Sequence, residues 1–438
     1  MVNSFPVDLA KAVHLELQRL QVVSPELGIL VDLFEALYFA SLKTEELQPI
    51  TCYIVYLDPA NPDPKPPKRI LKDRWSCVRL VNPIPVTTGN LVKLAKASDP
   101  RTSSFAVYPD PKINGQLSIW GLIDQGNRHH DFLNHDVESG SARPGVFQAS
   151  IVGIGHLVTY VGLEKIAELK ANTLIGKTVD VLERGPIRDT LEAGIQSYRT
   201  TIERLLLEGD LLNPEDIDTF HFMWDVSLAS HWISSLRRLL LRAQNLGHGG
   251  AILITPALIT PNASPEGLNV KYRIDYPRLQ VALESHALTN IQTVIASDII
   301  MEQYLDEDAE DIPVWLHLDE VVGTSDLEES RSEIDGTIWF ISLLTRVDGL
   351  VLMNSHLEVQ GFGVEITYSN RPSAIAIAEN QHATKIRQDS SIYDHYGTRH
   401  RSMMRYCSQV PNSVGFVISQ DGDVWWTPLS RHDFGARS

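Results

Sequence analysis

The feature that most constrains this chain is GGAILITP, residues 249–256, an apolar run of the length of one strand. A strand with apolar residues on both faces has to be covered on both sides, and in soluble proteins helices usually provide the cover. The segment before it predicts such a helix, ending near Asn245 and Gly247. Its apolar face is expected to contain Trp232, Ile233, Leu236, Leu239, Leu240 and Ala243. The fold class expected is therefore α/β, with a mixed β-sheet flanked by helices.

Farther along the chain, similar patterns predict one more helix and two strand pairs. The helix is expected over residues 327–345, because Ser325 and Glu328 have the spacing of a capping box. An Asp-Gly dipeptide at 421–422 is typical of a hairpin turn. The strand pairs expected are 347–353 with 357–366, and 414–419 with 423–426.

The N-terminal half predicts a second mixed α/β domain. Two helical stretches are followed by a proline-dense segment at 58–69 and then by short strand-like runs up to residue 162. The sequence LLNPEDIDTF, with a proline and three acids, marks a domain boundary near residue 213. Two domains are expected, 1–212 and 213–438, in keeping with a length of 438 residues.

The net charge of −17 excludes broad electrostatic binding to nucleic acid or to an anionic membrane, since both require a basic surface. The first residues, MVNSFPVDLAKAV, have neither the charged nor the long apolar region of a signal peptide. No stretch offers the roughly 18 uninterrupted apolar residues that a membrane span requires. A cytoplasmic protein is expected.

The sharpest local signal is GTRHRS, residues 397–402, at the expected start of a helix. Gly397 permits close approach of a ligand, Thr398 can cap the helix or donate its hydroxyl, and the first amides of the helix face outward. Arg399 and Arg401, with His400 between them, add charge-assisted donors suited to phosphate oxygens. This pattern is typical of a polyphosphate cradle, although surface arginines paired with nearby acids would give the same spacing.

An acidic residue lies just inside the strand expected over residues 347–353, which otherwise contains no polar side chain. Asp348 lies at its start, and Gly349 allows a ligand or a second backbone to approach. The carboxylate could hold Mg²⁺ or Mn²⁺, or accept a proton from a hydroxyl nucleophile. The alternative is a turn in which Asp348 caps backbone amides before the strand. A second Asp-Gly, at 335–336, lies in a helical pattern and is not considered a site.

Together these motifs resemble diadenylate cyclase domains, the nucleotide-binding family named after the N-terminal domain of the DNA-integrity scanning protein. The resemblance rests on Asp348-Gly349-Leu350, which corresponds to that family's D-G-A motif, and on Gly397 to Arg401, which corresponds to G-T-R-H-R. The segment WISSLRRLLLRAQNLGHGGAILI also looks like the opening of that domain. The similarity extends over roughly residues 215–430.

The resemblance implies an enzyme that joins two ATP molecules into cyclic di-AMP with release of pyrophosphate. Each subunit of a homodimer or larger homo-oligomer would bring one ATP, so that two active sites face each other. The resemblance assigns Asp348 and Asp421 to a Mg²⁺ or Mn²⁺ ion and Asp348 also to activation of the 3′-hydroxyl. It assigns the phosphates to Thr398, Arg399, His400 and Arg401, with Ser419 contacting them from the neighbouring strand. Gly349 belongs with Asp348 to the catalytic motif, and Leu350, Gly397 and Gln420 are placed at the nucleotide.

The N-terminal half resembles sensor modules fused to some bacterial cyclases of this family, notably in SIWGLID and VGIGHLV. A small-molecule or protein effector would bind there and bias whether two cyclase domains face each other. Leu350 in place of alanine and Gln420 after the serine support an alternative, a catalytically inactive domain that binds nucleotide and regulates a partner.

Overall fold

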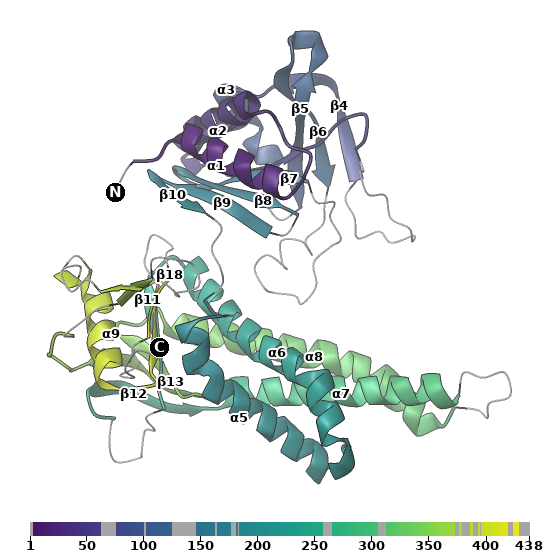
Figure 1. Cartoon of the computed structure of the whole chain (residues 1–438), viewed down its shortest axis with the longest axis vertical. Coiled ribbons are helices and arrows are strands. Elements are labelled where there is room, and N and C mark those ends of the chain that lie inside the picture. The colour runs from purple at the N-terminus through teal and green to yellow at the C-terminus, as the bar shows by residue number, and fades with distance from the viewer. Residues whose placement is uncertain are drawn as a thin grey trace, which may run out of the picture. The chain divides into compact units, whose positions relative to one another are not determined.

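The computed structural model describes two compact units, Met1–Thr178 and Val179–Ser438. The description covers residues 3–62, 76–99, 102–124, 146–162, 164–176, 181–182, 184–256, 265–304, 312–372, 376–378, 386–388, 393–394, 396–418 and 424–428. Both units combine helices with a mixed sheet, which confirms the expected fold class (Figure 1). No helix in these ranges combines the length and the apolar character needed to cross a bilayer.

The first unit is an eight-stranded sheet with helices packed on one face. The strand order is β10-β9-β8-β7-β3-β5-β6-β4, and only the β3–β5 pair is parallel. Apolar residues of α1 and α2 meet the sheet in one buried cluster. The helices are α1 (Pro6–Arg19), α2 (Leu27–Ser41) and α3 (Thr88–Leu94), with short 3-10 turns at Ala95–Ala97 and Pro111–Ile113. The strands are β1 (Thr44–Glu45), β2 (Gln48–Pro49), β3 (Cys52–Tyr56), β4 (Ser76–Pro85), β5 (Ser103–Asp110), β6 (Gln116–Asp124), β7 (Phe147–Gly153), β8 (His156–Val161), β9 (Glu164–Lys170) and β10 (Thr173–Gly176).

The second unit is a six-stranded sheet, in the order β12-β14-β13-β11-β17-β18, between two layers of helices. Its helices are α5 (Pro186–Glu208), α6 (Ile217–Asn245), α7 (Arg278–Gln303), α8 (Val314–Leu344) and α9 (Thr398–Gln409), with a 3-10 turn at Pro214–Asp216. Its strands are β11 (Gly250–Ile254), β12 (Leu268–Tyr276), β13 (Leu350–Met353), β14 (Val359–Ile366), β17 (Val414–Ile418) and β18 (Val424–Pro428), and a separate pair is β15 (Ala376–Ala378) with β16 (Ile386–Gln388).

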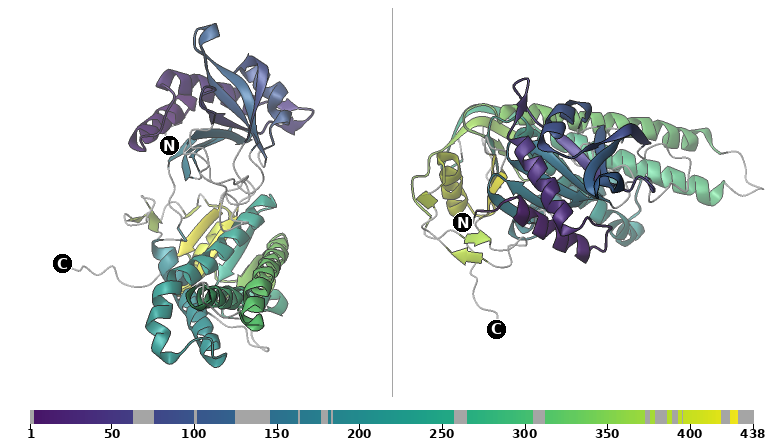
Figure 2. Two further views of the ribbon diagram at one scale, coloured as in Figure 1. Left: turned by 90° about the vertical axis from the view of Figure 1, so that its right-hand side faces the viewer. Right: turned by 90° about the horizontal axis from the view of Figure 1, so that it is seen from above.

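The central strand β11 is buried on both faces, as its sequence predicts. Ile252 and Ile254 face the helices α5 to α8, whereas Ala251 and Leu253 face α9. Figures 1 and 2 show these helices on opposite sides of the sheet. The apolar face predicted for α6 is buried, and the helix ends at Asn245, two residues before Gly247 with φ +64°. These predictions are confirmed.

Both predicted strand pairs form. Strands β13 and β14 pair antiparallel around a turn in which the Asn354 side chain accepts hydrogen bonds from the amides of His356 and Glu358, each at 3.0 Å. Strands β17 and β18 also pair antiparallel, from Ile418 opposite Val424 to Val414 opposite Pro428. The turn at 421–422 lies outside the described residues.

The expected domain boundary is displaced. The compact units divide between Thr178 and Val179, not at 212/213. Helix α5 belongs to the second unit because its apolar face, including Leu191, Ile195 and Ile202, joins the core formed by α6, α7 and the sheet. The proline at 214 begins a short turn between two helices of one core and does not separate two domains.

The helix expected over 327–345 begins earlier, at Val314. Ser325 therefore lies inside α8 and does not cap it. The additional turns pack against α7, where Leu316 joins Ala296 and Ile300 and where a side chain at Gly323 would meet Thr293 Oγ1 at 2.3 Å. Figures 1 and 2 show α7 and α8 side by side as one long hairpin. Tertiary packing thus extends the helix past the local stop signal.

We expect Glu168 to stabilise the first unit above moderately acidic pH. Its carboxylate accepts hydrogen bonds from His156 Nε2 and Lys165 Nζ, each at 2.7 Å. Burial alone raises the pKa of Glu168, but these two partners outweigh burial and hold it at about 2, below the ordinary 4.5. The stabilisation is therefore complete above about pH 4.5 and is lost as the pH falls toward 2.

Glu168→Gln should cost about 1–3 kcal/mol at neutral pH and speed hydrogen exchange of the β8 and β9 amides about tenfold. Glu45→Gln, which removes a carboxylate elsewhere in the unit, is the control and should change exchange by less than about twofold. Equal exchange in the two variants would contradict the role given to Glu168.

Candidate functional site

The start of β13 and the end of β17 lie at the same edge of the second unit's sheet. Strand β13 runs parallel to β11, with Val351 opposite Ile252. Strand β17 runs antiparallel to β11, with Ile418 opposite Gly250. The start of β13 and the end of β17 therefore meet at the edge where β11 begins. Asp348 precedes β13 at this edge, which we call the Asp348 edge.

Helix α9 has its N-terminal end toward the same edge. Its C-terminal half lies near the opposite edge, because Thr255, directly after β11, is within 3.4 Å of the Tyr406 hydroxyl and 2.9 Å of the Ser413 hydroxyl. Farther back along the helix, Met403 packs on Gly415, where an added Cβ would meet the methionine side chain at 2.2 Å. The helix thus runs back along β17, and its first residue, Thr398, lies toward the Asp348 edge.

The backbone position of Asp348 depends on the next residue, Gly349, which no other residue can replace without strain. Gly349 has φ +111°, a region that side chains rarely adopt. An added Cβ would lie 2.6 Å from the carbonyl carbon of Gly363 and 2.8 Å from Val364 N, both on β14. The Asp348 side chain itself is exposed. The bend presents the carboxylate to solvent while the glycine packs against the neighbouring strand.

Lys271 of β12 is a cation near Asp348 that sequence reasoning missed. Its ammonium group forms an ion pair with Glu365 at 2.7 Å. The pKa of Lys271 is raised, chiefly by the hydrogen bond and the charge of Glu365 and to a smaller extent by the charge of Asp348. The alternating pattern LNVKYRIDY predicts an edge strand. Only the register of β12 on β14 brings Lys271 close to the carboxylate of Asp348.

Leu350 points away from the Asp348 edge surface and into the core. Its side chain is 5 % exposed and packs in a cluster with Leu352, Val364 and residues of α9 such as Met403. The leucine therefore adds bulk to the core and not to the surface beside Asp348.

The amides at the start of α9 have no side-chain cap. The N-cap residue is Gly397, and Thr398 is the first residue of the helix. The expectation that Thr398 caps the helix is therefore wrong, and its hydroxyl remains as a donor. The Gly397 carbonyl accepts a hydrogen bond from the amide of Arg401 at 3.1 Å. The first amides of an α-helix have no partner within the helix, so the hydroxyl of Thr398 and these amides form one set of donors.

The two arginines of the motif are available for an anion. Arg399 is exposed and Arg401 is half-buried. Among the residues that the structure describes, neither guanidinium has a carboxylate partner, whereas Arg371 pairs with Asp394 at 3.1 Å. The alternative in which the two arginines pair with nearby acids is therefore not supported in this part of the chain. Two guanidinium groups with no carboxylate partner among the described residues favour binding of a multiply charged anion at this helix start.

His400 differs from its neighbours because it is neutral at physiological pH. Its ring stacks on Tyr396, with centroids 5.5 Å apart and planes 28° apart. Burial lowers the pKa of His400 below its ordinary 6.5. The positive charge of the motif thus comes from the arginines, and His400 holds the start of α9 against Tyr396, a contact absent from the sequence pattern.

A divalent cation fits Asp348 by its donor chemistry. Mg²⁺ is commonly held by one or two carboxylates together with phosphate oxygens and water. Within the described ranges, no three His, Cys, Asp or Glu side chains gather closely enough to hold an ion alone. Asp421, the second expected metal ligand, lies outside the described residues, as do Ser419 and Gln420. Strand β17 ends at Ile418, directly before them.

Gly349→Ala should destabilise the second unit by about 2 kcal/mol or more, because it adds strain at positive φ and a backbone clash with β14. Gly336→Ala is a matched control, since this glycine also follows an aspartate but lies in α8 with nothing within 4 Å of an added Cβ. The control should be neutral or stabilising by up to about 1 kcal/mol. Urea unfolding of both variants tests this, and similar stability of the two would contradict it.

Acidification should destabilise the wild type more than a His400→Phe variant. The pKa of His400 is lowered in the folded state, so its contribution to stability is complete above about pH 6.5 and is lost as the pH falls through the lowered value. Phenylalanine keeps the ring stack on Tyr396 without the titration. Melting temperatures at about pH 7.5 and pH 5 should show a smaller decrease for the variant, and equal decreases would count against a depressed pKa.

Comparison with known proteins finds one matching family model. Residues 20–124 match the family described as "Probable sensor domain DACNV". No curated protein and no solved structure matches the chain. The match begins directly after α1 and ends with β6, so it lies wholly in the first unit and includes SIWGLID but not VGIGHLV.

Proposed function

We propose that the second unit is a diadenylate cyclase, a metal-dependent nucleotidyltransferase that condenses two ATP molecules into cyclic di-AMP, and that the first unit regulates it. The observation that carries the proposal is the convergence of Asp348 and the start of α9, with Arg399 and Arg401, on one sheet edge. A carboxylate and a phosphate-binding helix start in this arrangement suit phosphoryl transfer, which needs mainly positioning and charge neutralisation.

In this proposal the start of α9 binds the triphosphate. Arg399 and Arg401 neutralise phosphate oxygens, and the hydroxyl of Thr398 and the free amides orient them. His400 stays neutral and fixes the helix start through its stack on Tyr396. Ser419 and Gln420, directly after β17, would complete the cradle. Gly397 leaves room for the phosphates because it has no side chain.

Asp348 would act on the 3′-hydroxyl that attacks the other ATP. Its exposed carboxylate would hold Mg²⁺ or Mn²⁺ with the phosphates and accept hydrogen-bond donation from the attacking 3′-hydroxyl. The bound ion would supply charge stabilisation as pyrophosphate leaves. Each 3′-hydroxyl would give its proton to the carboxylate of Asp348 as its oxygen forms a bond to the α-phosphorus of the other ATP. The bond from that phosphorus to the oxygen bridging to the β-phosphate breaks, so two pyrophosphates are released. Because each unit holds one ATP, ring closure requires a homodimer or larger homo-oligomer.

The match to a probable sensor domain supports the regulatory half of the proposal, since the N-terminal half resembles sensor modules fused to bacterial cyclases of this family. The burial of Leu350 counts against the steric argument for an inactive nucleotide-binding domain. The cyclase is therefore the function we favour.

Full-length protein incubated with ATP and Mg²⁺ or Mn²⁺ should form cyclic di-AMP, detected by mass spectrometry. Arg399→Ala/Arg401→Ala should lower ATP affinity by about tenfold or more, because two charge-assisted contacts are lost. The control, Arg204→Ala/Arg278→Ala, removes two exposed arginines elsewhere in the unit and should bind ATP as the wild type does. The cyclase proposal fails if wild-type protein binds ATP with either ion but forms no product.

Asp348→Asn should abolish turnover while leaving ATP affinity within about threefold, because the phosphates are held mainly by α9. Asp326→Asn, an exposed aspartate of α8, is the control and should retain full turnover. Product formation by Asp348→Asn at the wild-type rate would remove Asp348 from the reaction. Binding and turnover are measured separately, so loss of the fold is distinguished from loss of chemistry.

A further inference from the structure

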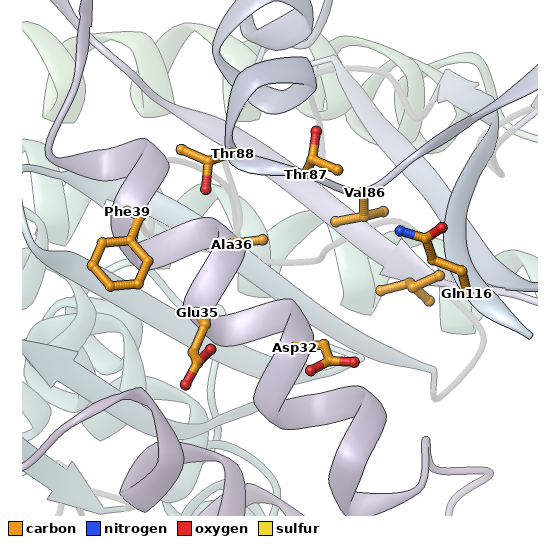
Figure 3. A pocket seen from close by; sticks show the side chains of 9 residues that line it. Asp32, Glu35, Ala36, Phe39, Val86, Thr87, Thr88 and Gln116 are labelled. Atoms are coloured by element: carbon orange, nitrogen blue, oxygen red, sulfur yellow. The ribbon is translucent and has the colours of Figure 1, made fainter.

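The first unit contains a cavity of about 350 Å³ between α2 and the segment that leads into α3. Helix α2 forms one wall with Asp32, Glu35, Ala36 and Phe39 (Figure 3). The other wall consists of Val86, Thr87, Thr88, Gln116 and Leu117. All nine residues lie within the region that matches the probable sensor domain. The volume is in the range of small-molecule sites.

The cavity has an apolar floor and an acidic rim. Ala36 and Leu117 are buried, with 9 % and 6 % of their surfaces exposed, and Val86 is half-buried beside them. Asp32 and Glu35 are exposed above this floor, one helical turn apart. Among the residues that the structure describes, the lining contains no lysine, arginine or histidine. The site therefore combines a net charge of about −2 with a hydrophobic base.

No described residue neutralises either carboxylate. In the ranges that the structure describes, Asp32 and Glu35 form no ion pair and no side-chain hydrogen bond. Thr87 already accepts a hydrogen bond from the amide of Asn90, at 3.2 Å, so its hydroxyl is fixed on the rim. A ligand that brings positive charge would meet two unused acceptors without displacing an internal partner.

Phe39 adds an aromatic surface to the same rim. Its ring is 52 % exposed and follows Glu35 by one turn of α2. An aromatic face beside carboxylates attracts organic cations through both the ring quadrupole and the carboxylate charge. A bare divalent ion would gain nothing from the ring or from the apolar floor, and an anion would be repelled by the rim.

We propose that this cavity binds a small organic ammonium ion with a hydrocarbon portion. The ammonium group contacts Asp32 and Glu35, and the hydrocarbon portion covers Ala36, Val86 and Leu117 next to Phe39. The ligand would thereby join α2 to the segment before α3. This inference gives the effector of the proposed sensor a chemical class, but the binding itself stands whether or not the second unit is a cyclase.

The test uses full-length protein and two probes of nearly equal shape, phenethylammonium and the neutral 2-phenylethanol, with affinities measured by saturation-transfer NMR. The cation should bind at least about tenfold more tightly than the alcohol. Asp32→Asn/Glu35→Gln should remove this preference. The control, Asp326→Asn/Glu329→Gln, changes two exposed acids with the same spacing on α8 and should keep the preference.

Equal affinity for the two probes in the wild type would overturn the proposal. So would an equal loss in the control variant, since that would indicate nonspecific attraction to an acidic protein. Competition by about 1 mM Mg²⁺ or Ca²⁺ at constant ionic strength would assign the carboxylates to a metal ion and also overturn it. No readout depends on turnover, so failure here is distinguishable from failure of the proposed cyclase reaction.

Discussion

The burial of β11 on both faces is the constraint on which the second unit depends. Alternate residues of this strand enter two separate cores, one shared with α6 to α8 and one shared with α9. The second core is small, and Met403 closes it by packing on Gly415. Because α9 is fixed along β17 by this contact, its first turn reaches the edge where Asp348 precedes β13. The candidate site is therefore a product of sheet packing as much as of the motifs themselves.

The spacing of apolar residues along the sequence predicted the helices and strands that pack against neighbouring elements on one face or on both. The apolar face of α6, its end before Gly247 and the fully buried β11 were all predictable, since burial leaves a regular pattern in the residues. The domain boundary and the start of α8 were not. In both places a local signal, the proline at 214 and the capping box at Ser325, was overridden by packing against a neighbouring helix.

The composition of the candidate site was predictable, but its geometry and charge were not. The sequence identifies Asp348 as a carboxylate suited to a metal ion or a proton, and Arg399 and Arg401 as groups suited to phosphate. Their position at one edge of the sheet follows from the register of β11, β13 and β17. The direction of Leu350 depends on the pleat of β13, and the neutrality of His400 depends on burial beside Tyr396. Side-chain direction and local solvation arise only when distant segments meet, so a linear pattern cannot contain them.

The backbone conformation at Gly349 bears on which residues related domains can lose. The glycine is required by the closeness of β14 and by its positive φ, regardless of any ligand. The neighbouring aspartate is exposed and carries no comparable demand from the fold. Under the proposed function, a related domain that lost the reaction would keep the glycine and could lose the aspartate at little cost in stability. The aspartate, and not the Asp-Gly dipeptide as a whole, would then distinguish related domains that retain the proposed reaction from those that do not.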